Sequence, residues 1–332
     1  MLDVVVYISS VLNPNKHYRK VACLENFALG VTNAGGTVQV QRANEYIPSK
    51  LAVILGWVTE DGTGANIRLR KTIIEKQKEI GYHTMCIDAS CWKYLDNYGT
   101  YLRYSIGGPF YDKAEYANRN SSSEKWEEIS QALQTQLQDP QINMQGHILI
   151  CVQRDGGFSM KNLDPLEWLD EKIAGIRKFT NRKILVRPHP GTWQDPTIVR
   201  VDKKGRQKSC LNKYYWPDFK PLVDKYDVTI IDPLLSKLQD NLVDAHSAVF
   251  FNSSASVAAV CAGIPVFVDD QSCVAWKVAN KNIRNIEYPR RFNKNLKQQW
   301  LYDLAAAHWS DDDARSGKIY QKFLPYIDQS SG

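Results

Sequence analysis

Apolar and polar positions alternate in a regular order along the first part of the chain. Short apolar runs predict four strands, at Val4–Ile8, Thr37–Val40, Leu51–Leu55 and Tyr82–Ile87. Apolar residues at helical spacing predict two helices, over residues 20–34 and 66–80, and each pattern ends at glycine. The resulting order, β-α-β-β-α-β, indicates an α/β domain built on a parallel sheet.

The next stretch, from Ala89 to Ser123, lacks both periods and is rich in aromatic residues and glycine. We expect a long irregular segment, which inside a folded domain is usually functional. A helix is predicted over residues 124–138, and the polar residues after it predict a domain boundary. Residues 1–143 are therefore expected to form an N-terminal Rossmann-like domain.

The second half repeats the alternation of strands and helices more regularly. Strands are predicted at His147–Val152, Lys183–Arg187, Val228–Ile231, Ala248–Phe251 and Ile264–Val268. A capping-box pattern at 164–167 begins one helix, and small residues over 255–261 predict another. We expect residues 144–290 to form a second Rossmann-like domain. Residues 291–332 are predicted to be helices that pack back toward the first domain, one of them running through Trp309.

Unusual polar residues in the second half follow the predicted strands. They are Arg154, Gly156, Gly157, Arg187, His189, Asp232, Asn252, Ser253 and Ser254. Loops after parallel strands meet at one sheet edge, where ligands bind, and these residue types suit phosphate oxygens. Without a Walker loop or GxGxxG, a nucleotide diphosphate or nucleotide-sugar fits better than an NTPase or dehydrogenase ligand. A serine that only caps the next helix explains the serine pair equally well.

The composition narrows the class of protein only slightly. The 332 residues are 43% apolar and 23% charged, as in ordinary globular proteins, and the formal charge of +6 permits an acidic partner. No apolar run approaches the ~20 residues that span a bilayer. The N-terminus has no basic leader pattern, and the seven scattered cysteines fit buried thiols. We therefore expect a cytoplasmic protein with no membrane partner and no protein metal site.

Two motifs resemble bacterial GT-B glycosyltransferases. Arg187-Pro188-His189-Pro190, followed downstream by Ser253-Ser254 and a small-residue helix, resembles the donor domain of the sialyltransferase and capsule or Kdo transferase groups. This resemblance implies two Rossmann-like domains that face each other across a cleft. It also implies that His189 contacts the donor phosphate and that the two serines hold the phosphate or the base-ribose end.

The whole chain resembles phage-encoded glycosyltransferases more closely. The shared segments are Gly56-Trp57-Val58, Ile87-Asp88, residues 101–105, residues 187–190 and residues 275–278. The resemblance implies an enzyme of T-even-like bacteriophages, acting in the cytoplasm of the infected host. It would move glucose or arabinose from a UDP-sugar onto 5-hydroxymethylcytosine in double-stranded DNA, and so protect the DNA from host nucleases. A divalent cation on the donor diphosphate stays open.

Glycosyl transfer to a hydroxyl group needs a carboxylate that takes the hydroxyl proton, and two acids of the first domain are candidates. Asp88 ends a predicted strand and belongs to the longer resemblance. Asp61 lies in Glu60-Asp61-Gly62, which resembles the sialyltransferase motif whose second acid is the catalytic base. For each acid taken singly, a helix cap or turn residue is an equally good explanation.

Two basic clusters are candidate DNA-phosphate contacts, Lys203, Lys204 and Arg206, and then Arg290, Arg291 and Lys294. Five aromatic residues of the long segment are candidate shelters for a flipped base: Trp92, Tyr94, Tyr101, Tyr104 and Phe110. Aromatic residues in loops, however, often only pack against their own domain. Two other hypotheses stay open. One is a capsule-type GT-B enzyme acting on a polysaccharide or lipid, and the other is a non-catalytic nucleotide-sugar-binding protein.

Overall fold

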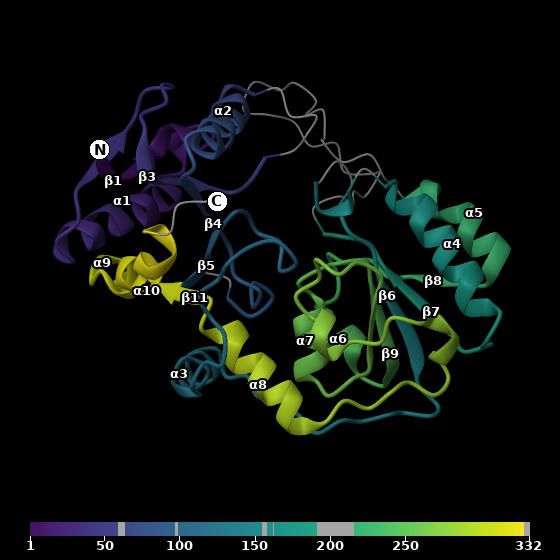
Figure 1. The fold of residues 1–332 in the computed structure, drawn as a ribbon. Helices are drawn as coiled ribbons and strands as arrows, with labels where there is room; N and C mark the ends of the chain where they lie inside the picture. Colours follow the sequence, from purple (N-terminus) through teal and green to yellow (C-terminus); the bar gives the residue numbers. More distant parts are fainter. Residues whose placement is uncertain (59–63, 97–98, 155–157, 162, 191–215, 329–332) are drawn as a thin grey trace. The chain divides into compact units, whose positions relative to one another are not determined.

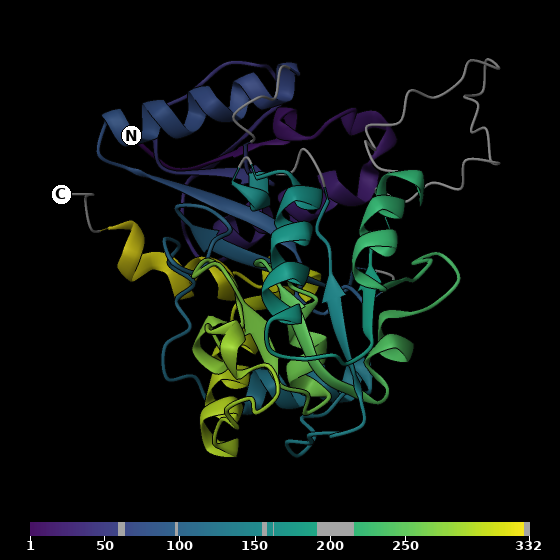
Figure 2. The same ribbon diagram turned by 90° about the vertical axis from the view of Figure 1, so that its right-hand side faces the viewer.

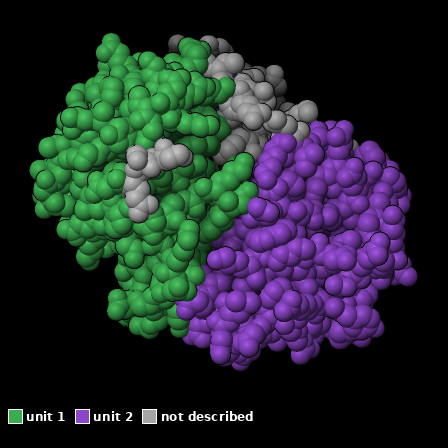
Figure 3. All heavy atoms as spheres, in the orientation of Figure 1, with its two compact units in different colours: residues 1–133, 301–332 green, residues 134–300 purple. Residues whose placement is uncertain are grey.

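The computed structural model describes residues 1–332 except 59–63, 97–98, 155–157, 162, 191–215 and 329–332. The chain divides into two compact units (Figure 3). Unit 1 comprises Met1–Leu133 and Leu301–Gly332, and unit 2 comprises Gln134–Trp300. The division falls somewhat before the predicted boundary at residue 143, and the C-terminal residues from 301 onward belong to unit 1.

Unit 1 is built on a six-stranded sheet with the order β11-β5-β4-β3-β1-β2. The strands are β1 (Leu2–Tyr7), β2 (Val38–Gln41), β3 (Ser49–Leu55), β4 (His83–Ala89), β5 (Tyr101–Ile106) and β11 (His308–Ser310). The strands β2, β1, β3 and β4 are parallel to one another, as the sequence predicts. β5 pairs antiparallel with β4, and β11 pairs antiparallel with β5.

Two strands of this sheet correct the sequence prediction. The stretch over 89–123 is not irregular throughout, because residues 101–106 form β5. The last predicted helix does not run through Trp309, because α8 (Lys294–Ala305) ends earlier and Trp309 lies in β11. Both strands exist through antiparallel pairing, β5 with β4 and β11 with β5, and a three-residue strand has no period of its own to detect.

Helices cover both faces of the unit 1 sheet (Figure 1). α1 (Tyr18–Asn33), α9 (Asp311–Arg315) and α10 (Lys318–Ile327) share one apolar core with the sheet, and α2 (Ala65–Glu79) packs on a second. Gly30 allows α1 to approach α9 closely, since a Cβ there would lie 1.8 Å from the Ala314 carbonyl oxygen. A residue in the N-terminal part of the chain thus fixes the C-terminal helices on unit 1.

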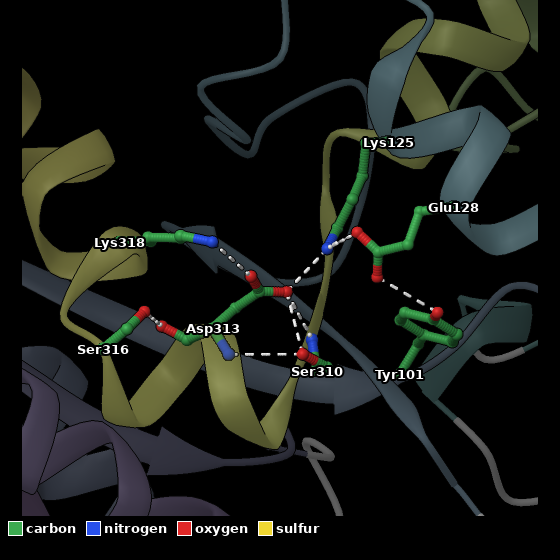
Figure 4. Close-up of polar contacts among 7 residues, drawn as sticks. All are labelled: Tyr101, Lys125, Glu128, Ser310, Asp313, Ser316 and Lys318. Atoms are coloured by element: carbon green, nitrogen blue, oxygen red, sulfur yellow. Dashed lines mark hydrogen bonds and ion pairs between the residues drawn. The ribbon is translucent and has the colours of Figure 1, made fainter.

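A charged cluster fastens α9 to the rest of unit 1 (Figure 4). Ser310 caps α9 by accepting from the Asp313 N–H at 3.2 Å, and the Asp313 carboxylate accepts from Ser310 in return. Lys125 of α3 (Glu124–Leu133) reaches Asp313 Oδ2 at 2.6 Å. Burial by itself raises the pKa of Asp313, but the bonds from Lys125 and Ser310 outweigh burial and lower it. The three acids at 311–313 thus form the first turn of α9.

Unit 2 has a five-stranded, fully parallel sheet with the order β10-β9-β6-β7-β8. The strands are β6 (His147–Cys151), β7 (Ile184–Arg187), β8 (Thr229–Ile230), β9 (Ala245–Phe250) and β10 (Val266–Val268). Figure 2 shows α4 (Pro165–Arg177) and α5 (Trp216–Tyr226) together on one face, and α6 (Leu238–Leu242) and α7 (Ser256–Cys261) lie on the other. Asp164 caps α4 as predicted.

Candidate active site

A cavity of about 620 Å³ lies in unit 1 at the edge of the sheet where the parallel strands end. Its walls come from the loop after β1, the first turns of α1, the ends of β3 and β4, the start of β5 and the first residue of α9. This edge is where open parallel sheets bind ligands, and the volume falls within the roughly 300–1,000 Å³ typical of ligand pockets. The cavity is therefore the candidate active site of unit 1.

Asp88, one of the two candidate bases, lies in the wall of this cavity at the end of β4. Its side chain is 36% exposed, and its Oδ2 accepts a hydrogen bond of 2.7 Å from the guanidinium of Arg103. The two residues are direct cross-strand partners in the β4–β5 pairing. Oδ1 accepts no hydrogen bond from any residue that the structure describes. One carboxylate oxygen is thus fixed by the protein, and the other is left for a ligand.

The guanidinium of Arg103 is buried against two aromatic rings. Its guanidinium carbon lies 5.6 Å from the ring centre of Tyr111 and 5.9 Å from that of Tyr116, and its side chain is only 11% exposed. The two tyrosine rings stack on each other at 4.4 Å. Burial raises the pKa of both phenols, so they stay neutral beside the guanidinium. Asp88 therefore serves as the counter-ion of a buried charge and is held in one orientation.

Arg70 of α2 brings a second guanidinium to the cavity wall. It donates to the backbone carbonyls of Ser10 and Trp57, and burial lowers its pKa. Gly56 adjoins it with φ +72°, and a Cβ at Gly56 would lie 3.3 Å from Arg70 Nη1. Arg70 forms no ion pair with a described carboxylate, so its positive charge adds to the field in the cavity.

Three more cations and one more acid line the same cavity, Arg19 and Lys20 of α1, Lys93 after β4, and Asp311 of α9. Lys20 and Lys93 are exposed, and neither forms an ion pair with any described residue. The thiol of Cys23 also faces this region, but burial raises its pKa to about 12. Cys23 is therefore not a nucleophile, and cationic side chains outnumber acids in the cavity wall.

In unit 2, the predicted residue Asn252 is at the centre of a closed hydrogen-bond network. Its Oδ1 accepts from Gln153 at 2.7 Å, and its Nδ2 donates to the Ser159 carbonyl and to Ser272. Ser272 donates in turn to Asp270, which pairs with Lys161 at 2.7 Å. The network joins the ends of β6 and β9 to the loop after β10. Asn252 thus fixes the shape of this sheet edge.

The serine pair occupies the connection between β9 and α7. Ser253 Oγ accepts from the Ala255 N–H at 3.2 Å, and its carbonyl accepts from Ser256. Ser254 is exposed. No serine side chain caps α7, which begins after Ala255 and has six residues. Ser253 therefore orders the turn, and Ser254 presents its hydroxyl to solvent.

Arg187 at the end of β7 is buried and binds the loop after β8 together with the helix α6 that follows it. Its guanidinium donates to Asn241 Oδ1 at 2.5 Å, to Ser236 Oγ at 3.1 Å and to the carbonyls of Pro233 and Ser236. Asp232 sits at the start of this loop and accepts from the Leu234 N–H at 2.8 Å. Arg187 and Asp232 thus shape the loop after β8.

His189 and Arg154, the other described donor-site candidates, are exposed beyond the ends of β7 and β6. Gly156, Gly157, Asp61, Lys203, Lys204 and Arg206 lie outside the described residues. The candidates His189, Arg154, Asn252, Ser253 and Arg187 all follow strands of the one parallel sheet of unit 2. Their assignment to a donor remains a prediction.

The DNA-contact candidates show no common arrangement among described residues. Lys294 forms an ion pair with Asp139 at 2.6 Å, the guanidinium of Arg290 lies 5.0 Å from the ring centre of Phe292, and Arg291 is exposed. Of the five aromatic candidates, Tyr94 and Phe110 are half-buried, whereas Trp92, Tyr101 and Tyr104 are at most 4% exposed. These three rings belong to the interior of unit 1, so the expectation that they shelter an extrahelical base is wrong.

Four of the residues around Asp88 were not predicted from the sequence: Arg103, Arg70, Lys20 and Lys93. Arg103 lies in the segment expected to be irregular, where no strand register connects it to Asp88. Lys20 and Lys93 look like ordinary surface lysines until the fold brings α1 next to the end of β4. Among the described residues, no cluster of histidine, cysteine and acidic side chains has the geometry of a metal site.

The two units define the class of this protein: two Rossmann-like α/β units, each with polar residues at the carboxyl edge of its parallel strands. No protein-family model matches the chain, and no curated protein matches it. Among solved structures, the Thermosulfurimonas dismutans KpsC β-Kdo 2,4 transferase is similar, with a TM-score of 0.53 and 14% identity, covering 92% of this chain and 89% of that one.

The β-Kdo 2,7 transferase of KpsC from the same organism is also similar, with a TM-score of 0.51 and 13% identity, covering 96% of this chain and 99% of that one. The chain therefore has the GT-B-like fold of these glycosyltransferases, along nearly its whole length. The neighbours also match one of the groups to which the His-Pro and paired-serine motifs pointed. None of the described helices is both long and apolar enough to cross a membrane.

Proposed function

We propose that this protein is a glycosyltransferase that moves a sugar from a nucleotide-sugar to a hydroxyl group of a saccharide, as capsule-type enzymes do. The likeness to two Kdo transferases, which extends over both units, carries the proposal. The cavity around Asp88 supports it independently, because it supplies a carboxylate at a ligand-sized site. Unit 1 would bind the acceptor, and unit 2 would bind the donor.

Asp88 is the proposed general base. Oδ1 takes the proton from the acceptor hydroxyl, the hydroxyl oxygen attacks the anomeric carbon, and the bond from that carbon to the donor phosphate breaks. Arg103 holds Oδ2 and keeps the carboxylate in place for this transfer. The leaving diphosphate takes up negative charge, which cationic and N–H donors stabilise.

On the donor side, His189, Arg154 and Ser254 are the described residues proposed to contact the diphosphate. His189 and Arg154 are exposed donors that follow neighbouring parallel strands, and Ser254 presents a hydroxyl at the end of β9. Four other predicted residues would not contact the diphosphate but would fix the loops that carry these donors: Asn252, Ser253, Arg187 and Asp232. A UDP-sugar is the proposed donor, with or without a divalent cation on its diphosphate.

A saccharide acceptor has more support than 5-hydroxymethylcytosine in phage DNA. The structural neighbours are named as Kdo transferases, and three of the five aromatic residues expected to shelter a flipped base are buried. Lys294, one of the expected phosphate contacts, is already paired with Asp139. Restriction evasion and a phage source therefore rest only on the short sequence motifs.

An acceptor screen with a mass readout tests the proposal. The protein is incubated with UDP- and CMP-linked sugars and with acidic oligosaccharides, neutral oligosaccharides, and duplex DNA containing cytosine or 5-hydroxymethylcytosine. A mass gain on a saccharide is the expected result. A gain confined to the hydroxymethylated duplex would overturn the acceptor and keep the transferase. No gain and no nucleotide release with any donor would leave a non-catalytic nucleotide-sugar-binding protein.

A further inference from the structure

The charge of the unit 1 cavity bears on what kind of acceptor it accepts, an inference that rests on the proposed function. The lining includes four cationic side chains, Arg19, Lys20, Arg70 and Lys93, and two acids, Asp88 and Asp311. One of these acids is already neutralised, because Asp88 pairs with Arg103 at 2.7 Å behind the wall. Lys20, Arg70 and Lys93 form no ion pair with a described residue, so these three side chains leave the cavity with a positive excess.

Burial strengthens this field. Arg70 is held away from bulk water, and it donates to backbone carbonyls instead of to a carboxylate. Charges that solvent screens poorly act over longer distances, and a concave low-dielectric wall focuses their field. The net charge of an anionic group is attracted by such a field, which draws the group into the cavity toward its cationic side chains, whereas a neutral sugar has no net charge for the field to attract.

Two lysines are placed to meet that anionic group. Lys20 comes from the first turns of α1 and Lys93 from the loop after β4, so they approach the cavity from separate elements. Neither forms an ion pair with a described residue, and both are exposed. Each ammonium group is therefore available to a ligand without first breaking a bond within the protein.

We propose that Lys20 and Lys93 form an anion subsite beside Asp88, and that the acceptor of this enzyme is an acidic saccharide. The negative group, a carboxylate or a phosphate ester of the sugar, lies between the two lysines. The acceptor hydroxyl then lies at Oδ1 of Asp88. The subsite places the hydroxyl and selects against neutral sugars, and Arg70 supports it through its field.

Ligand-observed NMR titration without a donor tests the subsite independently of sugar transfer. The probes are methyl β-glucuronide, methyl β-glucoside 6-phosphate and the neutral methyl β-glucoside, each titrated into the full chain. The variants are Lys20→Gln, Lys93→Gln and the double variant. Lys322→Gln is the matched control, because it removes the same charge from an exposed site on α10 that does not line the cavity.

At least one of the two anionic probes is expected to bind about fivefold or more tightly than the neutral glycoside, and each single lysine variant is expected to remove most of that preference. Binding of the neutral probe should not change, and Lys322→Gln should behave as the parent protein does. Which anion is preferred distinguishes a sugar carboxylate from a sugar phosphate.

Equal binding of charged and neutral probes would overturn the subsite, as would a preference that survives in the double variant. In a contrary outcome, a short DNA duplex displaces the glycosides from the parent protein and fails to bind the same lysine variants. That result would assign the two lysines to nucleic-acid binding and overturn the saccharide subsite. Anion binding that follows the lysines in a protein without transferase activity would keep the subsite and overturn the proposed function. The two proposals therefore fail separately.

Discussion

The two units use the same sheet edge in opposite ways. In unit 1 the polar residues at the ends of the parallel strands open onto a cavity, and Asp88 keeps one carboxylate oxygen unbound by described residues. In unit 2 the described polar residues Asn252, Arg187 and Asp232 bond to neighbouring loops of their own unit. A polar residue after a strand thus marks either a ligand contact or a loop anchor, and its partners decide which.

This contrast also separates two kinds of arginine. Arg103 and Arg187 are both buried and end up near a strand terminus, but Arg103 pairs with a carboxylate that faces the cavity. Arg187 instead donates to the amide oxygen of Asn241 in α6, and to a hydroxyl and two carbonyls of the loop before that helix. Replacement of Arg103 should lower the rate of sugar transfer, because it frees the side chain of Asp88. Replacement of Arg187 should lower the stability of unit 2.

The largest effect is expected for Asp88→Asn. The amide keeps an oxygen for Arg103 but cannot take a proton, so sugar transfer should fall by about a thousandfold. Initial rates with saturating donor and acceptor measure the change. Asp311→Asn, which alters the other acid of the cavity wall, is the control and should stay within about threefold of the parent. Near-normal turnover of Asp88→Asn would show that the cavity in unit 1 does not supply the catalytic base.

Arg187→Met should mainly affect stability. It leaves Asn241 Oδ1, the Ser236 hydroxyl and two carbonyls without their donor, and should cost about 3 kcal/mol of unfolding free energy. Urea denaturation of the whole protein and, in a separate experiment, native-state hydrogen exchange of the β7 amides measure this loss of unfolding free energy. Arg154→Met is the matched control, since Arg154 is exposed, and should change the unfolding free energy by less than about 0.5 kcal/mol. Equal costs would show that the loop network of unit 2 contributes little.

Acid should destabilise unit 1 through His308. This buried ring donates from Nδ1 to the Leu304 carbonyl and accepts from the Cys91 N–H at Nε2, so it is satisfied only when neutral. Burial lowers its pKa from 6.5 to about 3. His308 in the unfolded chain has the higher pKa, so it takes up a proton at a higher pH than it does in the folded protein. The contribution of neutral His308 to the unfolding free energy is therefore complete above pH 6.5 and is lost as the pH falls toward 3.

Between pH 7 and pH 5 the loss from His308 should reach about 2 kcal/mol. Hydrogen exchange of β5 and β11 at the two pH values, in the parent and in His308→Gln, measures it. The variant is less stable at pH 7 but should lose about 2 kcal/mol less on acidification. An identical pH dependence in the two proteins would contradict a neutral His308.

The smallest effect is expected for Gly56→Ala, compared with Gly35→Ala. Both glycines have positive φ, +72° and +84°, so alanine at either should cost about 1 kcal/mol of unfolding free energy. Only Gly56 adjoins Arg70, while a Cβ at Gly35 meets nothing within 4 Å. Thermal unfolding should therefore change similarly, and binding of the anionic glycoside should weaken only in Gly56→Ala. Weakening in both variants would mean that strain alone, without Arg70, explains the loss.

The sequence alone determined most of the α/β architecture. The apolar runs predict every parallel strand of both sheets. For the central strands, such as β3 and β9, the reason is burial on both faces, which requires a continuously apolar run, whereas the edge strand β2 alternates valine and glutamine. It also predicts that polar residues gather at the strand ends and that Asp88 is among them. The helix beginning at Asp164-Pro165 is correct for a local reason, since the cap is formed within the helix itself.

Only the tertiary structure decided which polar residues stay available to a ligand. The pairing of β5 with β4 places Arg103 on Asp88, and the packing of α1 against the sheet brings Lys20 to the same cavity as Lys93. The closed network around Asn252 likewise joins Gln153, Ser159 and Ser272 from separate segments. These contacts depend on strand register and helix packing between distant parts of the chain, which local hydrophobic periodicity does not encode.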